Sequence, residues 1–341
     1  MALLTVQFGM QPMLTAKYTP KTVTRSTVIF VQEAIKFTFA MFMLIVSGGF
    51  RSAVQGWSIY SWIKIAALPA GLYTVQNTAA LMAYQHLDGI TFNVLNQTKT
   101  LSAALCCYLI MGRKQSNLQI VALVMLLVSA LIIEHIVSLD VILPFVTKQG
   151  ISSSTPTTNM TFSQSSISHK HLTHGVLPVL LASFLSGLAG AISQKNLQSS
   201  CGSGEKGGRN PYLFSAELCI ASLLLLLISM IFSDDGAQIQ QYGFFHHWTP
   251  ETLIPIVTNA IGGIVVGLVT KYAGSVQKGF ALIFGMLLTG LIQSGLEGNP
   301  VTKEELIGGL VASVSLYLHA THPYSETQKS NGSSSRKTKR D

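Results

Sequence analysis

The sequence predicts an all-α polytopic membrane protein with about ten transmembrane helices. Its mean hydropathy is +0.44, and 11% of its residues are charged, against about 25% in soluble domains. Apolar stretches of about 20 residues, the length that crosses a bilayer as a helix, recur along the chain. One Ser/Thr-rich segment interrupts this pattern near the middle. Together these observations argue against a soluble domain.

The predicted spans follow one another with short polar connections. They cover about residues 1–17, 27–48, 59–84, 89–111, 117–137, 174–196, 211–233, 250–271, 276–296 and 303–320. The first is the weakest, because it is short and contains Gln7 and Gln11. The third is long and contains Pro69-Ala70-Gly71, which permits a kink.

The Ser/Thr-rich segment divides the chain into two halves. We expect a first transmembrane half at residues 1–138, a linker at 139–173, a second transmembrane half at 174–321 and a basic tail at 322–341. Each half holds an odd number of predicted spans, which forces the halves into opposite orientations. The sequence therefore predicts two inverted five-helix halves, a repeat layout found in many transporters.

The distribution of Lys and Arg predicts the orientation. With the N-terminus in the cytosol, more of these cations fall on the cytosolic side, as the positive-inside rule requires. The linker is then lumenal, so Asn159 in the sequon Asn159-Met160-Thr161 is a predicted glycosylation site. The net charge of +8 lies mainly in loops and the tail and does not indicate a nucleic-acid partner.

The chain lacks the sequence patterns of the common enzyme and metal sites. No Cys/His cluster suggests a metal, and no nucleotide-hydrolase or dehydrogenase motif suggests a cofactor. No Ser/His/Asp arrangement can be assembled either. We therefore do not expect an enzyme.

A lysine near the middle of the fourth predicted span is the most informative residue. A charge at mid-bilayer costs about 2.5–3.5 kcal/mol on insertion scales, so Lys99 should face a watered cavity, an anion or a partner. Asn96 lies three residues before it, on the same helical face, and Gln97 is adjacent. Amides suit base edges or sugar hydroxyls, and an ammonium suits a phosphate. The cluster favours a substrate site over interhelical hydrogen bonding alone.

Two further lysines flank the break between the eighth and ninth predicted spans. Lys271 and Lys278 would form an anion site there, or would be cytosolic anchors of the positive-inside type. Lys278 is the stronger candidate. In the second span, Glu33 and Lys36 share a face and would either line a pathway or neutralise each other near a helix end.

The remaining candidates are weaker. Asn77, beside Gln76 in the third span, would bind substrate or serve as interhelical glue. Glu217 lies near Ser215 in the seventh span. It would pair with a lysine, contact sugar hydroxyls, or be a protonated structural residue.

Several motifs, in order over about residues 30–320, resemble those of the nucleotide-sugar transporters of the Golgi and endoplasmic reticulum. They are Tyr73-Thr74-Val75-Gln76-Asn77, Leu87-Asp88, Asn96-Gln97-Thr98-Lys99, Ser233-Asp234-Asp235-Gly236, Tyr242-Gly243-Phe244-Phe245, and Gly262-Gly263 through Lys271-Tyr272 to Lys278-Gly279-Phe280. The branch is that of CMP-sialic acid, UDP-galactose and UDP-N-acetylglucosamine carriers. The chain is most similar to plant-type carriers of UDP-N-acetylhexosamines in the endoplasmic reticulum.

The resemblance implies the drug/metabolite-transporter fold and the exchange of cytosolic nucleotide sugar for lumenal nucleoside monophosphate. It implies that Asn77 and Lys99 contact the nucleotide and its phosphate and that Lys278 contacts the phosphate. Glu33 and Lys36 match the Glu and Lys of a motif in the second helix. UDP-N-acetylglucosamine and UDP-N-acetylgalactosamine are the favoured substrates, with UDP-galactose and CMP-sialic acid left open.

The chain departs from the family pattern around the nucleotide base. Phe92 and Asn96 stand where animal CMP-sialic acid carriers have tyrosines. Ser215, Cys219 and Ala221 stand where those carriers have Asn, Tyr and Ser. These changes argue against CMP as the preferred nucleotide.

The basic tail indicates where the protein is located. Lysines at the third and fifth positions from the end, Lys339 and Lys337, resemble a retrieval signal, which favours the endoplasmic reticulum over the Golgi membrane. The lipid bilayer is a partner, and a homodimer is one option for assembly. The alternatives to an antiporter are a non-transporting membrane scaffold or regulator with the same fold, and a carrier of another phosphorylated metabolite.

Overall fold

The computed structural model is a bundle of helices. It describes residues 1–20, 22–87, 92, 95–133, 172–198, 208–297 and 302–323. The longer helices are α1 (Ala2–Tyr18), α2 (Arg25–Val46), α5 (Leu68–His86), α7 (Lys99–Met111), α8 (Asn117–Ile133), α11 (Leu177–Gln198), α12 (Pro211–Phe232), α14 (Leu253–Tyr272), α15 (Ser275–Glu297) and α16 (Lys303–Thr321). Shorter ones are α3 (Phe50–Val54), α4 (Ile59–Trp62), α13 (Asp234–Tyr242) and the one-turn helices η1 (Ile63–Ala67), η2 (Leu172–Val176) and η3 (Pro250–Thr252).

The predicted all-α membrane class is confirmed at this level. No strand occurs in the part of the chain that the structure describes. Five helical segments there are long and apolar enough to cross a membrane: α2, η2 with α11, α12, η3 with α14, and α15. The count of ten spans stays a prediction. Most of the predicted linker, with Asn159, and the basic tail lie outside the described residues.

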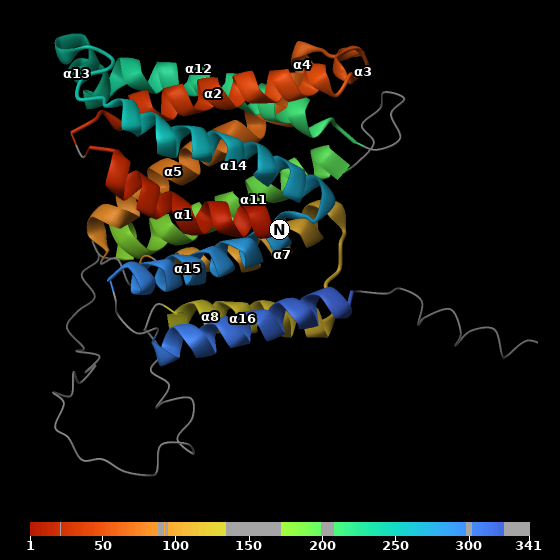
Figure 1. Cartoon of the computed structure of the whole chain (residues 1–341). Coiled ribbons are helices and arrows are strands. Elements are labelled where there is room, and N and C mark those ends of the chain that lie inside the picture. Colours follow the sequence, from red (N-terminus) through yellow and green to blue (C-terminus); the bar gives the residue numbers. More distant parts are fainter. Residues whose placement is uncertain are drawn as a thin grey trace, which may run out of the picture.

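The helices are stacked in layers, as Figure 1 shows. The pair α2 and α12 forms one edge of the bundle, and the pair α8 and α16 forms the opposite edge. Between these edges lie α14, α1, α11, α15 and α7. The middle layers are therefore flanked by helices on two sides, which is where a polar site would be shielded from lipid.

The third predicted span is interrupted near the expected kink. The π-helical turn η1 joins α4 to α5, and Pro69 follows it in the first turn of α5. Because proline has no N–H, it cannot donate to the carbonyl oxygen of Ile65 four residues earlier. Asn196 of α11 supplies the missing donor, with its Nδ2 atom 3.0 Å from that oxygen. The break in one helix is thus completed by a side chain from another.

Two glycines let the central helices approach closely. A Cβ atom added at Gly187 of α11 would lie 2.6 Å from the backbone nitrogen of Ala103 in α7. A Cβ added at Gly279 of α15 would lie 2.6 Å from the hydroxyl of Thr100, also in α7. Small residues at helix contacts are typical of membrane bundles. They bring α11 and α15 directly against the turn that carries Lys99.

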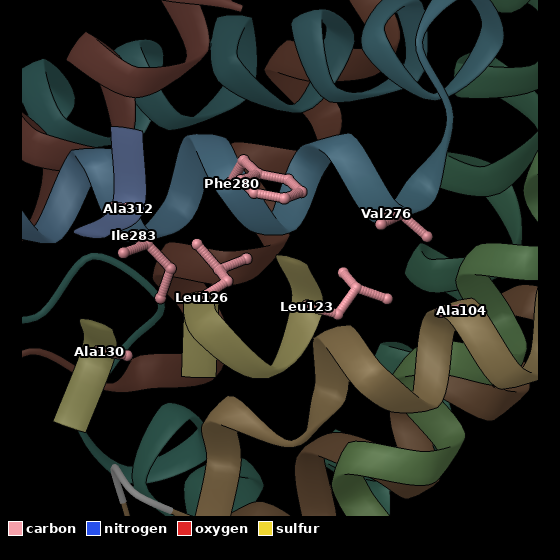
Figure 2. Packing of buried hydrophobic residues seen from close by; sticks show 8 residues of the cluster. All are labelled: Ala104, Leu123, Leu126, Ala130, Val276, Phe280, Ile283 and Ala312. Carbon is pink, nitrogen blue, oxygen red and sulfur yellow. The ribbon is translucent and has the colours of Figure 1, made fainter. Parts of the chain in front are cut away.

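The largest buried apolar cluster joins the α8–α16 pair to the centre. Its members, drawn in Figure 2, are Ala104, Leu123, Leu126, Ala130, Val276, Phe280, Ile283 and Ala312. They come from α7, α8, α15 and α16, and the ring of Phe280 is fully buried. Hydrogen bonds tie the pair further: Gln119 Nε2 donates to the carbonyl oxygen of His319 at 3.2 Å, and the Ser315 hydroxyl donates to that of Ala122 at 2.5 Å.

Two segments that lack a long uninterrupted apolar run also form helices that pack on the bundle. The polar helix α13 is not among the predicted elements, because its sequence lacks a long apolar run. Its Asp235 accepts a hydrogen bond from the backbone N–H of Ser26, 3.2 Å away in the first turn of α2. The weak first span is helical: α1 packs on α14 and α15, and Gln11 Nε2 donates to the carbonyl oxygen of Pro255 at 2.9 Å.

Candidate functional site

A cavity of about 220 Å³ lies between α1, α7, α11, α14 and α15, and we call it the inner cavity. Its lining residues are Phe8, Lys99, Thr100, Ala103, Ser186, Gly190, Val266, Ser275, Lys278, Gly279 and Leu282. Lys99 is the first residue of α7, directly after a turn at Thr98. Lys278 lies in the first turn of α15, which begins after Gly274. The sequence candidates Lys99 and Lys278 therefore meet in one cavity.

The charge of this cavity is unbalanced. The two ammonium groups lie close enough for their charges to repel each other. No carboxylate is among the described residues that line the inner cavity. Thr100, Ser186 and Ser275 add hydroxyls, and the start of α15 adds the positive end of a helix dipole. Two cations in an apolar bundle, without a carboxylate beside them, suit an anion with more than one negative charge.

Glu33 and Lys36 form an ion pair elsewhere in the bundle. Lys36 Nζ lies 2.5 Å from Glu33 Oε1, well inside α2 rather than near its end. The Lys36 side chain passes Gly263 of α14, and the charges of the pair act on Cys219 of α12. Neither residue is among those lining the inner cavity. The pair joins α2, α12 and α14, and its part in substrate binding stays a prediction.

Glu217 is held by groups that the sequence did not single out. Arg209 Nε lies 3.1 Å from Glu217 Oε2, and Arg209 Nη2 also bonds Oε1. Trp57 Nε1 donates to Oε1 at 2.7 Å, and Trp62 Nε1 donates to the Glu217 carbonyl oxygen at 3.1 Å. The partner is thus an arginine, not the lysine that was one expectation.

Arg209 was missed because it precedes the start of α12 and counted only as a cytosolic cation in the sequence. Lys271 belongs to the same group, because its Nζ donates to the Arg209 carbonyl oxygen at 3.2 Å. Lys271 therefore contacts Arg209, whereas Lys278 lines the inner cavity.

The remaining candidates lie outside the inner cavity in the described contacts. Gln97 is buried, and its Nε2 donates to the sulfur of Met286 at 3.4 Å. Asn96 is half-buried one turn before Lys99. Asn77 is exposed on α5 and accepts from Gln76 Nε2 at 3.4 Å. The Ser215 hydroxyl donates to the Pro211 carbonyl oxygen within α12. Their substrate contacts stay predictions.

The uncharged residues that line the inner cavity do not stand out in the sequence. Ser186, Ser275 and Thr100 look like the many other hydroxyl residues of the spans, and Phe8 comes from the weakest predicted span. A hydroxyl in a membrane helix commonly bonds its own backbone, so its type alone predicts nothing. Only the packing of α1, α11 and α15 around α7 brings these residues to the lysines.

The fold and this cavity define a class: a helical membrane transporter with a cationic site in its interior. Residues 1–320 match the family described as "Nucleotide-sugar transporter". The chain belongs to the nucleotide-sugar transporter family, and its relatives are transporters.

Named relatives agree with this family. The UDP-N-acetylglucosamine transporter ROCK1 of Arabidopsis thaliana is 34% identical over 327 residues, 96% of this chain and 92% of that protein. The UDP-N-acetylglucosamine transporter of Rattus norvegicus is 25% identical over 75% of this chain and 71% of its own length. CMP-sialic acid transporter 2 of Oryza sativa subsp. japonica is 24% identical over 76% of this chain and 63% of its own length.

One solved crystal structure supports the fold. It superposes with a TM-score of 0.61 over 94% of both chains at 11% identity. At that identity the likeness concerns the fold alone.

Proposed function

We propose that the protein is an antiporter that exchanges a cytosolic nucleotide sugar for a lumenal nucleoside monophosphate. The observation that carries this proposal is the inner cavity, where Lys99 and Lys278 meet with no carboxylate among the described lining residues. The phosphates of the substrate would offset the two ammonium groups. Exchange needs no hydrolysis, because each nucleotide would move down its own gradient.

The substrate that we propose is UDP-N-acetylglucosamine or UDP-N-acetylgalactosamine. The relative with 34% identity over nearly the whole chain is named a UDP-N-acetylglucosamine transporter. The departures at Ser215, Cys219 and Ala221 in α12 argue against a CMP site. We propose the membrane of the endoplasmic reticulum as its location, on the two lysines near the end of the tail.

We also propose that the two halves are inverted repeats that alternate around the inner cavity. The helix contacts support this: α2 packs on α12, α7 on α15 and α8 on α16. Each pair joins helices at corresponding positions of the predicted halves. Likewise α1 packs on α15 as α11 packs on α7. Such a pattern is expected when two repeats are related by a two-fold axis in the membrane plane.

The test is a counterflow assay with purified protein in liposomes. Liposomes are preloaded with UMP, CMP or GMP, and uptake of each labelled nucleotide sugar is measured. We expect UMP to drive uptake of UDP-N-acetylhexosamines. Lys99→Ala or Lys278→Ala should lower that uptake at least about tenfold, the usual effect of losing a hydrogen bond to a charged group. Lys195→Ala, at an exposed position on α11, is the matched control.

Three outcomes would contradict the proposal. Full uptake by both cavity variants would remove the site assignment. Absence of any exchange by the folded wild-type protein would favour the scaffold or regulator alternative. Competition by inorganic phosphate as strong as that by UMP would favour a carrier of another phosphorylated metabolite.

A further inference from the structure

A second and larger cavity lies at the end of the bundle where α7 ends and α8 begins, and we call it the outer cavity. Its volume is about 580 Å³, within the range of about 300–1,000 Å³ that is typical of small-molecule sites. Its walls come from the α7–α8 connection, α11, the α14–α15 break and the last turn of α16. The positive-inside rule assigns this end, which carries Arg113 and Lys114, to the cytosol.

The outer cavity is stacked on the inner one. On α7, Ala103 lines the inner cavity and Cys107, one turn further, lines the outer cavity. On α11, Gly190 and Gln194 are divided in the same way. Ser275 lines the inner cavity, while its neighbours on both sides line the outer one. The two cavities therefore share their walls and are separated by about one helical turn.

Side chains, not an apolar core, fill the space between the cavities. Gln194 Oε1 accepts from the backbone N–H of Ser275 at 2.7 Å and from Cys107 Sγ at 3.4 Å. The Ser275 hydroxyl donates to the Gly190 carbonyl oxygen at 2.7 Å. We call these four residues the partition. These three hydrogen bonds connect α7, α11 and α15.

The outer cavity is lined by cationic and polar side chains. Arg113 and Lys114 are exposed at its mouth. Deeper inside, Gln115 Oε1 and His319 Nε2 are buried and have no hydrogen-bond partner among the described residues. His319 is only 7% exposed, and its ring packs against Phe280. Because a buried polar atom without a partner is unfavourable, the cavity suits an occupant with hydrogen-bonding groups.

We propose that the outer cavity is a second binding site for a phosphate-bearing ligand, where a nucleotide sugar from the cytosol binds before it passes the partition. Its phosphates would meet Arg113 and Lys114, and its other polar groups would meet Gln115 and His319. The proposal rests on the transport function proposed above.

An anionic lipid headgroup carries the same phosphate chemistry, and basic pockets at cytosolic helix ends do bind such lipids. Two observations favour the soluble nucleotide. The orphan His319 lies in the interior against Phe280, not at the rim, and Gln277 adds an amide from the first turn of α15. An amide suits sugar hydroxyls or a base edge more than acyl chains.

The first experiment separates capture from translocation. Uptake of UDP-N-acetylglucosamine is measured with full-length protein in UMP-loaded liposomes of neutral phosphatidylcholine. Arg113→Gln/Lys114→Gln should raise the half-saturating substrate concentration about tenfold and leave the maximal rate unchanged, because the inner lysines are intact. His319→Phe, which keeps the ring packing, should raise the half-saturating concentration as well. Lys195→Gln should change neither quantity.

Two results would overturn the outer site while leaving the transport function standing. One is that the wild-type protein exchanges nucleotides and both variants show the same half-saturating substrate concentration as the wild type. The other is an effect of Arg113→Gln/Lys114→Gln that appears only when phosphatidylinositol is added, which would assign the cations to lipid. If the wild-type protein shows no exchange at all, the transport proposal itself has failed.

A binding measurement gives a second, independent test. In the Lys99→Ala/Lys278→Ala variant, millimolar UMP should still raise the thermal midpoint of the detergent-solubilised protein. Adding Arg113→Gln/Lys114→Gln should abolish that shift. No shift by UMP in the folded variant that lacks the inner lysines would contradict a second site.

Discussion

The buried carboxylate of Glu217 shows how an intramembrane acid is held by hydrogen bonds from the protein without a substrate. Arg209, Trp57 and Trp62 all donate to this residue, and the side chain of Glu217 is almost fully buried. A substrate hydroxyl would have to displace one of these donors. The structure therefore favours a supporting role for Glu217, at the start of α12.

We expect Glu217→Ala to destabilise the protein by about 3–5 kcal/mol, because it leaves the arginine without its buried partner. Glu217→Gln should cost less, since an amide oxygen still accepts from Trp57. Glu251→Ala, at an exposed position, should have little effect. Thermal unfolding in detergent measures all three. An unchanged midpoint for Glu217→Ala together with lost exchange would instead make Glu217 a substrate contact.

At the scale of residues, charge is the property that marks candidate site residues most clearly in the sequence. Lys99 and Lys278 stand out because an ammonium in an apolar span needs an explanation. Amides and hydroxyls do not stand out, because they are stable in a membrane helix through many kinds of contact. Gln97, for example, turns to the sulfur of Met286, a contact that depends on how α15 packs.

The helices α7 and α11 approach each other closely beside the inner cavity. Gly187 makes it possible, since a Cβ there would collide with the backbone of Ala103. Gly71 of α5 offers a contrast, because no atom lies within 4 Å of a Cβ added there.

We expect Gly187→Ala to lower stability by about 1–3 kcal/mol through overpacking. Gly71→Ala should be neutral or stabilising by up to about 1 kcal/mol, because alanine is the better helix former. Thermal midpoints of the two variants check this difference. Equal midpoints would mean that α11 moves aside freely, and the close approach would then not hold the cavity wall.

Helix existence was predictable from apolar length, but local form was not. Pro69 indicates where the third span is interrupted. The π-helical turn and the hydrogen bond from Asn196 to the carbonyl oxygen of Ile65 depend on the packing of α11 and are not predictable from the sequence. The polar helix α13 escaped prediction because apolar length was the criterion, and its pairing with Ser26 is a tertiary contact.

On the scale of the whole molecule, a cross-link across the partition can test whether the proposed alternation between the two halves requires α11 and α15 to separate. The Cβ of Ser275 lies 3.5 Å from a Cβ added at Gly190, within the range of about 3.5–4.5 Å that a disulfide needs. A bond there would tie the start of α15 to α11 and hold the partition closed.

We expect oxidised Gly190→Cys/Ser275→Cys to lose nucleotide exchange and to regain it when the disulfide is reduced. Each single-cysteine variant should respond to neither oxidant nor reductant, which controls for the native thiols. Counterflow before and after reduction is the measurement. Undiminished exchange by the fully oxidised double variant would show that substrate does not pass between these two helices.

The Ser/Thr-rich linker predicts the division into halves, and the odd number of spans on each side of it predicts their opposite orientations. The structure pairs α2 with α12 and α8 with α16, helices that lie on opposite sides of the linker in the sequence, and the division itself stays a prediction. The sequence could not indicate two stacked cavities, because they arise where α7, α11 and α15 meet from distant parts of the chain. The sequence therefore predicts the lysines as candidates but not the cavities around them.

The thickness of the partition implies a discrimination by ligand length. One helical turn is about 5 Å, which is shorter than an extended nucleotide sugar. A long ligand could reach Lys99 and Lys278 with one end while its other end still lies in the outer cavity. Inorganic phosphate is too short to bridge the turn and would have to give up all contacts with one cavity before gaining those of the next. The protein would then sort anions by their reach as well as by their charge.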